Sequence, residues 1–233
     1  MKATIFILTL SFITHLGFGQ IKDFKTNVVD FFKHVQLERS PQILDARSLE
    51  EYEQAHLPSA IQIDQQAADF ERKIGKLDKG SPVFIYSIQT GRSQRLAEHL
   101  SKLSFHKIYV LSPGIAAWVG SGYPLVVSET NEKRISLEAF HTALTADEYV
   151  LVSFGSNYCP PCKKVIPVLD SLQRRSNDLR VVKVEIDVNP DIIKAYGVKT
   201  IPTTTLYRSG TAIWTKTGIP TVDEIWTARH EKQ

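Results

Sequence analysis

One short stretch decides how the second half of this chain folds: Tyr158-Cys159-Pro160-Pro161-Cys162-Lys163. It follows an apolar run, Tyr149 to Phe154, that predicts a buried strand, and it precedes a helical pattern. Residues three apart in a first helical turn have Cα atoms roughly 5–6 Å apart, which suits a disulfide. The free N–H groups at a helix start favour a thiolate at Cys159. Cys162, one turn further in, is expected to be more buried and to act as the resolving thiol.

These two cysteines are the only ones in the chain. As a structural staple they would close a very short loop, which stabilises by only about 2 kcal/mol, against roughly 3 kcal/mol for a fifteen-residue loop. A structural zinc site needs two further ligands, yet the chain has no second CxxC pair, and His141 and His230 are isolated. The spacing therefore predicts a redox-active disulfide that works without a metal or another cofactor.

The elements around this pair predict an α/β domain. Ser136 is a suitable N-cap for a helix that runs to about Leu144. Val181 to Asp187 reads as a strand. Two further strands, Thr203 to Tyr207 and Ala212 to Lys216, are joined by a hairpin turn at Ser209-Gly210, and a last helix covers about 222–229.

From about Ser136 to its end, the chain resembles the thioredoxin superfamily, with a mixed sheet as the expected fold. The CPPC stretch stands where thioredoxins carry W-C-G-P-C-K, Pro167 matches the proline that kinks the redox helix, and Thr200-Ile201-Pro202-Thr203 resembles the loop with a cis-proline. The resemblance implies that Cys159 attacks a disulfide and that Cys162 resolves the mixed disulfide.

The same resemblance implies that Tyr158, Ile201 and Pro202 contact the substrate. The implied partners are client proteins bearing thiols or disulfides, together with an unidentified electron donor or acceptor. Pro202 follows Cys162 by only 40 positions, which leaves no room for the helical insertion of the superfamily's oxidases and favours a reductant or isomerase. One departure is Ser153, which stands where thioredoxins have a buried aspartate.

The first half of the chain predicts a second α/β domain. Gln42 to Asp45, Val83 to Tyr86 and Ile108 to Leu111 are apolar runs typical of buried strands, and Arg92 to Leu103 has leucines at helical spacing. Strands that are apolar throughout and alternate with helices predict a parallel sheet covered on both faces.

Residues from about Asp23 to Val127 resemble the rhodanese family. The resemblance rests on Ile43-Leu-Asp-Ala-Arg-Ser48, on His56-Leu-Pro-Ser-Ala60 and on the closing run from Gly114 to Pro124. Where the family carries Y-C-x-x-G-x-R-S, this chain has Tyr86-Ser-Ile-Gln-Thr-Gly-Arg-Ser93, so Ser87 replaces the nucleophilic cysteine.

A serine hydroxyl cannot carry sulfur as a persulfide, so sulfurtransferase activity is not expected. Thr90 also replaces the loop glycine. Two roles stay open here: either Arg92 and the loop N–H groups hold an anion, or Arg92 and Ser93 merely cap and solvate a helix. Asp45, Arg47 and His56 are expected to hold the domain together.

The first nineteen residues predict a secretory signal peptide. A basic start, an apolar core of about 12 residues and small residues before Gln20 have this layout, although an uncleaved anchor is the alternative. The expected location is therefore periplasmic or extracellular, without stable membrane insertion after cleavage.

The expected plan is thus a signal peptide (1–19), a rhodanese-like domain (23–127), a polar linker (128–135) and a thioredoxin-like domain (136–233). Lysine and arginine total 28 against 25 acidic residues, without a basic cluster interleaved with aromatics, which argues against nucleic acid. The predicted function is that of an exported thiol–disulfide oxidoreductase. The alternative is a non-catalytic two-domain binding or adaptor protein.

Overall fold

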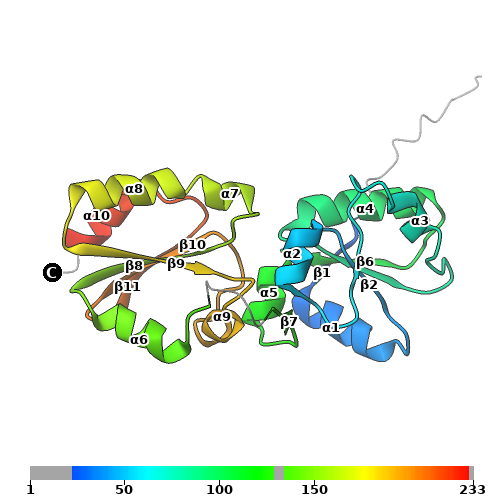
Figure 1. Ribbon diagram of the computed structural model, residues 1–233, viewed down its shortest axis with the longest axis horizontal. Coiled ribbons are helices and arrows are strands. Elements are labelled where there is room, and N and C mark those ends of the chain that lie inside the picture. Colours follow the sequence, from blue (N-terminus) through cyan, green and yellow to red (C-terminus); the bar gives the residue numbers. More distant parts are fainter. Residues whose placement is uncertain (1–22, 129–133, 231–233) are drawn as a thin grey trace, which may run out of the picture.

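A computed structural model of the chain describes residues 23–128 and 134–230. Figure 1 shows two α/β domains side by side, each with a sheet between two layers of helices. The predicted signal peptide lies outside the described residues, as do residues 129–133 of the predicted linker. The two-domain α/β architecture predicted from the sequence is confirmed.

The N-terminal domain is built on a five-stranded parallel sheet in the order β1-β6-β5-β2-β4. Its strands are β1 (Lys25–Asn27), β2 (Gln42–Asp45), β4 (Ile61–Gln62), β5 (Val83–Tyr86) and β6 (Ile108–Ser112). The central strand β5 is buried along its whole length, as its unbroken apolar run predicts. A separate antiparallel pair joins β3 (Ala55–His56) to β7 (Val126–Val127).

Helices cover both faces of this sheet, in agreement with the prediction. One face packs against α1 (Val28–Leu37) and α5 (Ile115–Gly120), through Phe31 and Trp118. The other face packs against α3 (Phe70–Ile74) and α4 (Thr90–Lys102), through Phe70 and Leu96. The short helix α2 (Leu49–Gln54) follows β2 and begins with a capping box between Ser48 and Glu51.

The C-terminal domain has a mixed sheet in the order β11-β10-β8-β9. Its strands are β8 (Tyr149–Gly155), β9 (Leu179–Glu185), β10 (Thr203–Arg208) and β11 (Thr211–Thr217). The pair β8–β9 is parallel, whereas β10 is antiparallel to both of its neighbours. The predicted strand from Val181 to Asp187 was placed two residues too late, because its register is set by pairing with β8, where Tyr149 faces Leu179.

The helices of this domain also lie on two faces. Phe140 of α6 (Leu137–Thr145) and Ile192 of α9 (Pro190–Ala195) pack on one side. Leu169 of α8 (Ile166–Arg175) and Ile225 of α10 (Val222–His230) pack on the other. Ser136 caps α6 as predicted, because its side chain accepts the Ala139 N–H.

The two domains share one apolar core. A single cluster of buried side chains runs from Phe31 and Trp118 in the first domain to Cys159, Val198 and Ile201 in the second. Helix α5 contacts α9 directly, and Figure 1 shows these two helices between the sheets. A Cβ added to Gly120 would lie 2.1 Å from the Val198 carbonyl oxygen, so only glycine allows the main chains to approach this closely.

Candidate active site

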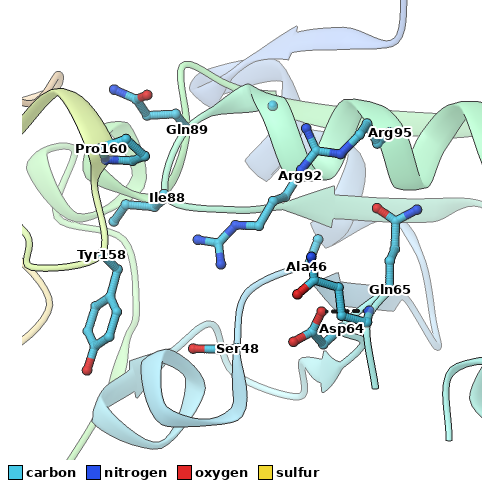
Figure 2. Close-up of a pocket in the computed structure, with 12 residues that line it drawn as sticks. Ala46, Ser48, Asp64, Gln65, Ile88, Gln89, Arg92, Arg95, Tyr158 and Pro160 are labelled. Carbon is cyan, nitrogen blue, oxygen red and sulfur yellow. Dashed lines mark hydrogen bonds between the residues drawn. The ribbon is translucent and has the colours of Figure 1, made fainter. Parts of the chain in front are cut away.

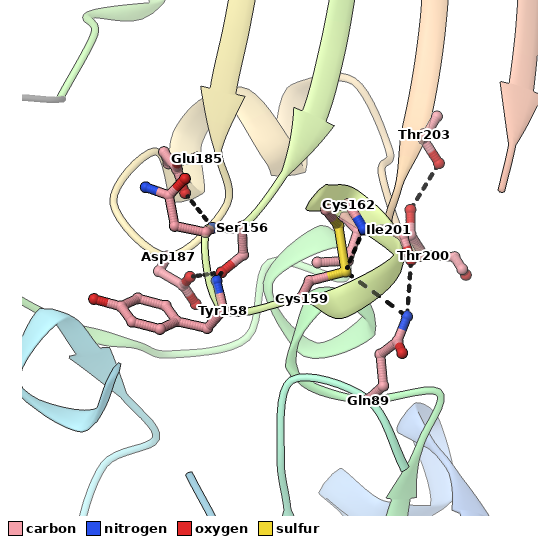
Figure 3. Close-up of a disulfide and its surroundings, with 11 residues drawn as sticks. Gln89, Ser156, Tyr158, Cys159, Cys162, Glu185, Asp187, Thr200, Ile201 and Thr203 are labelled. Atoms are coloured by element: carbon pink, nitrogen blue, oxygen red, sulfur yellow. Dashed lines mark hydrogen bonds between the residues drawn. A yellow bond between two sulfur atoms is a disulfide. The ribbon is translucent and has the colours of Figure 1, made fainter. Parts of the chain in front are cut away.

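Cys159 and Cys162 form a disulfide at the start of a short helix, α7 (Pro160–Lys163), that follows β8. Their Cα atoms are 5.2 Å apart, within the range that a disulfide requires. Cys159 is the N-cap of α7, and its Sγ accepts the Cys162 N–H at 3.4 Å (Figure 3). The two cysteines therefore occupy the first helical turn, as predicted.

Prolines shape the helix on both sides of the disulfide. Pro160 and Pro161 occupy the first turn of α7, where a backbone N–H has no intrahelical partner, so their missing donors cost little. Helix α7 ends at Lys163, and α8 begins at Ile166 with Pro167 in its first turn. The break matches the kink that the resemblance assigned to Pro167.

The relative burial of the two cysteines is the reverse of what was expected. Cys159 is 0% exposed and Cys162 is 8% exposed, although Cys162 was predicted to be the more buried residue. The prediction considered the C-terminal domain alone. In the two-domain chain, the N-terminal domain covers Cys159.

Gln89, in the loop between β5 and α4, is the residue that reaches the disulfide. Its Nε2 lies 3.9 Å from the Cys159 Sγ and donates a hydrogen bond to the Ile201 carbonyl oxygen at 3.1 Å (Figure 3). Gln89 was not among the predicted site residues. No local signal marks it, because its partners lie 70 and 112 positions further along the chain.

Ile201 and Pro202 lie in the loop before β10, beside the disulfide. The Ile201–Pro202 peptide bond is cis, as predicted. The Pro202 carbonyl accepts the Gly218 N–H at 2.8 Å, and the Thr203 hydroxyl donates to the Thr200 carbonyl at 2.7 Å. The loop is thus tied down on both sides of the proline, and the Ile201 carbonyl is left for Gln89.

Tyr158, the residue before Cys159, turns towards the N-terminal domain. Its hydroxyl accepts a hydrogen bond from the Gln54 Nε2 at 2.7 Å. Burial raises the pKa of Tyr158, and the nearby Glu50 carboxylate raises it further. Tyr158 therefore stays neutral and serves as a hydrogen-bonding contact between the domains.

A buried ionic network joins the domains on the same side. Arg47 is fully buried and binds Asp45 through Nε and Nη2 at 2.7–3.1 Å, and its Nη1 lies 3.3 Å from Asp187 in the other domain. Burial alone would lower the pKa of Arg47, but the charge and hydrogen bond of Asp45, together with Tyr86 and Asp187, outweigh it and raise the pKa.

Asp187 is held by one contact from Arg47 and by the Ser156 hydroxyl, which donates at 2.9 Å. Burial raises the pKa of Asp187, and these two partners oppose the shift only in part. Asp45 and Arg47 thus hold their own domain together, as expected, and Arg47 also holds the two domains to each other. His56 stacks on Tyr52 within its own domain.

In the loop from Ser87 to Ser93, the Arg92 guanidinium is paired with a carboxylate of its own domain. Both Arg92 guanidinium nitrogens Nη1 and Nη2 bind the buried Glu51 carboxylate, at 2.6 and 2.7 Å. Glu51 therefore neutralises the charge that an anion would need. Arg92 projects into a cavity of about 510 Å³ between the domains, which Tyr158 and Pro160 also line (Figure 2).

Ser87 and Ser93 lie inside this loop and hold its shape. The Ser87 hydroxyl is hydrogen-bonded to the Gln89 carbonyl and accepts the Ser93 N–H at 3.3 Å. The Thr90 carbonyl accepts the Ser93 hydroxyl at 3.1 Å. Both serines are fully buried, so Ser93 does not solvate the start of α4.

Metal ligands do not gather in residues 23–128 and 134–230. Within these ranges, no three His, Cys, Asp or Glu side chains come together in a group that would hold a metal ion. Nor does any helix in them combine the length and the hydrophobicity that crossing a membrane requires.

Known proteins resemble each half of the chain. Residues 131–229 match the thioredoxin family model, and residues 32–121 match the model of the rhodanese-like domain. A thioredoxin from Rickettsia typhi is 39% identical over 77 residues, which are 33% of this chain and 73% of that protein. A thioredoxin from Streptomyces clavuligerus is 32% identical over 87 residues, covering 37% of this chain and 81% of that protein.

Among solved structures, a mutant thioredoxin from Halobacterium salinarum NRC-1 is 26% identical, with a TM-score of 0.37 and coverage of 40% of this chain and 81% of that chain. The sequence matches and the disulfide at a helix start agree on one activity, thiol–disulfide exchange. The chain belongs to the thioredoxin family, as a thiol–disulfide oxidoreductase with a rhodanese-like domain ahead of its thioredoxin domain.

Proposed function

We propose that this chain is an exported oxidoreductase that exchanges the disulfides of client proteins through Cys159 and Cys162, as a reductant or isomerase. The observation that carries the proposal is the disulfide at the N-terminal turn of α7, where Gln89 contacts both the Cys159 sulfur and the Ile201 carbonyl. The signal-like first nineteen residues support export.

In the proposed reaction, the Cys159 thiolate attacks one sulfur of a client disulfide. The client S–S bond breaks, one client sulfur leaves as a thiolate, and the other forms a mixed disulfide with Cys159. Cys162 then loses its proton and attacks the Cys159 sulfur, which restores the Cys159–Cys162 bond and releases the second client thiolate. Two electrons pass to the client, so a reduced dithiol donor must restore the enzyme for each turnover.

In this reaction, groups around the two sulfurs stabilise the thiolate and contact the client. The Cys162 N–H, which the Cys159 sulfur already accepts, stabilises the thiolate of the reduced form. The Ile201 carbonyl binds the client main chain, and Tyr158 and Pro202 form the walls of the contact. Arg92 and Ser93 take no part in the exchange, because Glu51 and Ser87 hold them within their own domain.

The reaction is tested by reduction of a protein disulfide, such as that of insulin, with dithiothreitol as the donor. Cys159→Ser should abolish turnover, whereas Cys162→Ser should accumulate mixed disulfides that mass spectrometry locates at Cys159. Turnover that survives Cys159→Ser would overturn the mechanism. Export is tested separately by fractionating cells that express the full chain, where N-terminal sequencing should find a chain that begins at Gln20.

The full burial of Cys159 favours a second candidate, a two-domain binding protein in which the disulfide hardly turns over. A redox titration separates the two functions. A reversible two-electron couple in thiol buffers supports the oxidoreductase, because exchange requires a disulfide that those buffers can reduce. A bridge that the same buffers leave intact supports the binding protein.

A further inference from the structure

The loop that has lost the rhodanese cysteine covers the sulfur that the proposed reaction uses. Gln89 bridges the Cys159 Sγ and the Ile201 carbonyl, the two groups that a client must reach (Figure 3). Gln89 lines two cavities, of about 510 and 160 Å³. Of the described residues, those lining them include Pro160 and Ile201 but not Cys159, so neither cavity opens onto the sulfur.

The loop is held in this position from within its own domain. Ser87 fixes the Gln89 carbonyl through its hydroxyl, and the Ile115 N–H donates to the Ser87 carbonyl at 3.0 Å. Gly114, with φ of 137°, packs so closely that a Cβ there would lie 2.5 Å from the Ile88 carbonyl oxygen. If the loop moved by itself to take Gln89 away from the disulfide, all these contacts would break. Movement of the whole domain would keep them.

Several kinds of contact hold the two domains together. Among the described residues, and apart from Gln89, they include the hydrogen bond from Gln54 to Tyr158, the ion pair from Arg47 to Asp187, the packing of α5 on α9 and the apolar cluster that both domains share. The segment that joins the domains is polar, from Ser128 to Arg134. These contacts must break for the domains to separate.

Thiol–disulfide exchange requires the incoming sulfur to touch the sulfur it attacks. With Cys159 fully covered by the same chain, a folded client cannot make that contact. We propose that the rhodanese-like domain is an intramolecular cap on the redox centre, with Gln89 as its latch, and that the domains separate at the α5–α9 contact before a client reacts. The inference rests on the proposed function for the identity of the reacting sulfur.

The test compares how fast Cys159 of the reduced protein reacts with a small and a bulky alkylating agent. N-ethylmaleimide and a polyethylene-glycol maleimide, which carry the same reactive group, serve as the two reagents, and mass spectrometry identifies the modified cysteine. In the wild type, the bulky reagent should lag far behind the small one. Gln89→Glu removes the donor to the Ile201 carbonyl, and Gly120→Ala wedges α5 away from Val198.

Each of these variants should raise the relative rate of the bulky reagent by about tenfold, which is the change expected when one contact that holds the closed state is lost. Matched controls are Gln36→Glu on the exposed side of α1 and Gly80→Ala, whose added Cβ would meet only the Asp78 side chain at 3.4–4.0 Å. The controls should leave the ratio of rates unchanged.

The proposal is overturned if the bulky reagent modifies wild-type Cys159 as readily as N-ethylmaleimide does. It is also overturned if both variants remain folded by circular dichroism and still react like the wild type. Because alkylation needs no client protein, a negative result in this test does not count against the proposed exchange reaction. Conversely, both variants could show the raised labelling rate and still fail to reduce a client. That result would refute the proposed function but support the rhodanese-like domain as a cap.

Discussion

The Arg47 guanidinium of the rhodanese-like domain lies 3.3 Å from the Asp187 carboxylate of the thioredoxin domain, and both side chains are buried. Arg47 also binds Asp45 at 2.7 Å, so one cation serves two carboxylates from two domains. Buried charges are tolerated only when they are paired, because water no longer solvates them. Closure of the domains and stability of the first domain therefore depend on the same side chain.

Replacement of Arg47 should be strongly destabilising. Arg47→Leu leaves Asp45 and Asp187 buried without a cation, which typically costs about 3–5 kcal/mol of the free energy of unfolding. Chemical denaturation followed by circular dichroism measures the loss. Arg39→Leu, at an exposed position before β2, is the matched control and should change the free energy of unfolding by less than about 0.5 kcal/mol. Equal losses in both variants would show that Arg47 does not hold this network.

Asp187 should make the stability of the folded chain depend on pH. Burial raises its pKa in the folded chain, so the folded chain binds the proton more tightly than the unfolded chain does. The resulting stability is present below the ordinary carboxyl pKa and is lost as pH rises through the raised value. Arg47 and Ser156 contact Asp187, and the charges of Asp45 and Glu51 also act on it.

Asp187→Asn removes this titration. The stability of the wild type relative to Asp187→Asn should therefore fall as pH increases from about 4, the ordinary carboxyl pKa, towards neutrality. Denaturation of both proteins across this range measures the difference. A difference in free energy that stays constant over the range would mean that Asp187 titrates normally in the folded chain.

The rhodanese-like domain should show no thiosulfate:cyanide sulfurtransferase activity. Ser87 cannot form a persulfide, and Arg92 is already bound by Glu51. The Cys159→Ser/Cys162→Ser double variant has no thiol left, so any rate above background in it would contradict the prediction. Ser87→Cys should not restore activity, because position 87 is 0% exposed and Thr90 also alters the loop.

Sequence patterns predicted the elements whose signals are local. The apolar run at Val83–Tyr86 became the buried central strand β5, and Cys159 became the N-cap of α7. The offset of β9 arose because strand ends depend on pairing with a distant strand. Gln89 and the link from Arg47 to Asp187 were missed, since they depend on how two domains dock, and neither periodicity nor spacing records that.

Ser153 bears on the proton that Cys162 must lose before it resolves the mixed disulfide. Ser153 lies on β8, and its register partner on β9 is Lys183. Both residues line a small cavity of about 60 Å³ together with Cys162. Cys162 is largely buried, and burial disfavours a thiolate because the charge is poorly solvated. A neutral hydroxyl at Ser153 can relay this proton but cannot hold it.

Resolution by Cys162 should therefore be slow near neutral pH and should accelerate as pH rises. Ser153→Asp places a carboxylate at this cavity, where it can accept the proton, so the step should become faster near pH 7 by a factor within the range of about 10²–10⁴ typical of general-base catalysis. A half-buried carboxylate lowers stability unless it is paired, and the facing Lys183 offers a partner that limits the loss.

Stopped-flow measurement of mixed-disulfide decay, from about pH 6 to about pH 9 so that it brackets the ordinary thiol pKa, decides the matter. Ser153→Asn is the matched control, because it has nearly the shape of aspartate but cannot accept the proton as a carboxylate does. Faster decay in Ser153→Asp alone would assign proton removal to this position. If the wild type and both variants decay at one rate across the range, removal of the Cys162 proton does not limit resolution, since adding a base beside the thiol would then leave the slow step unchanged.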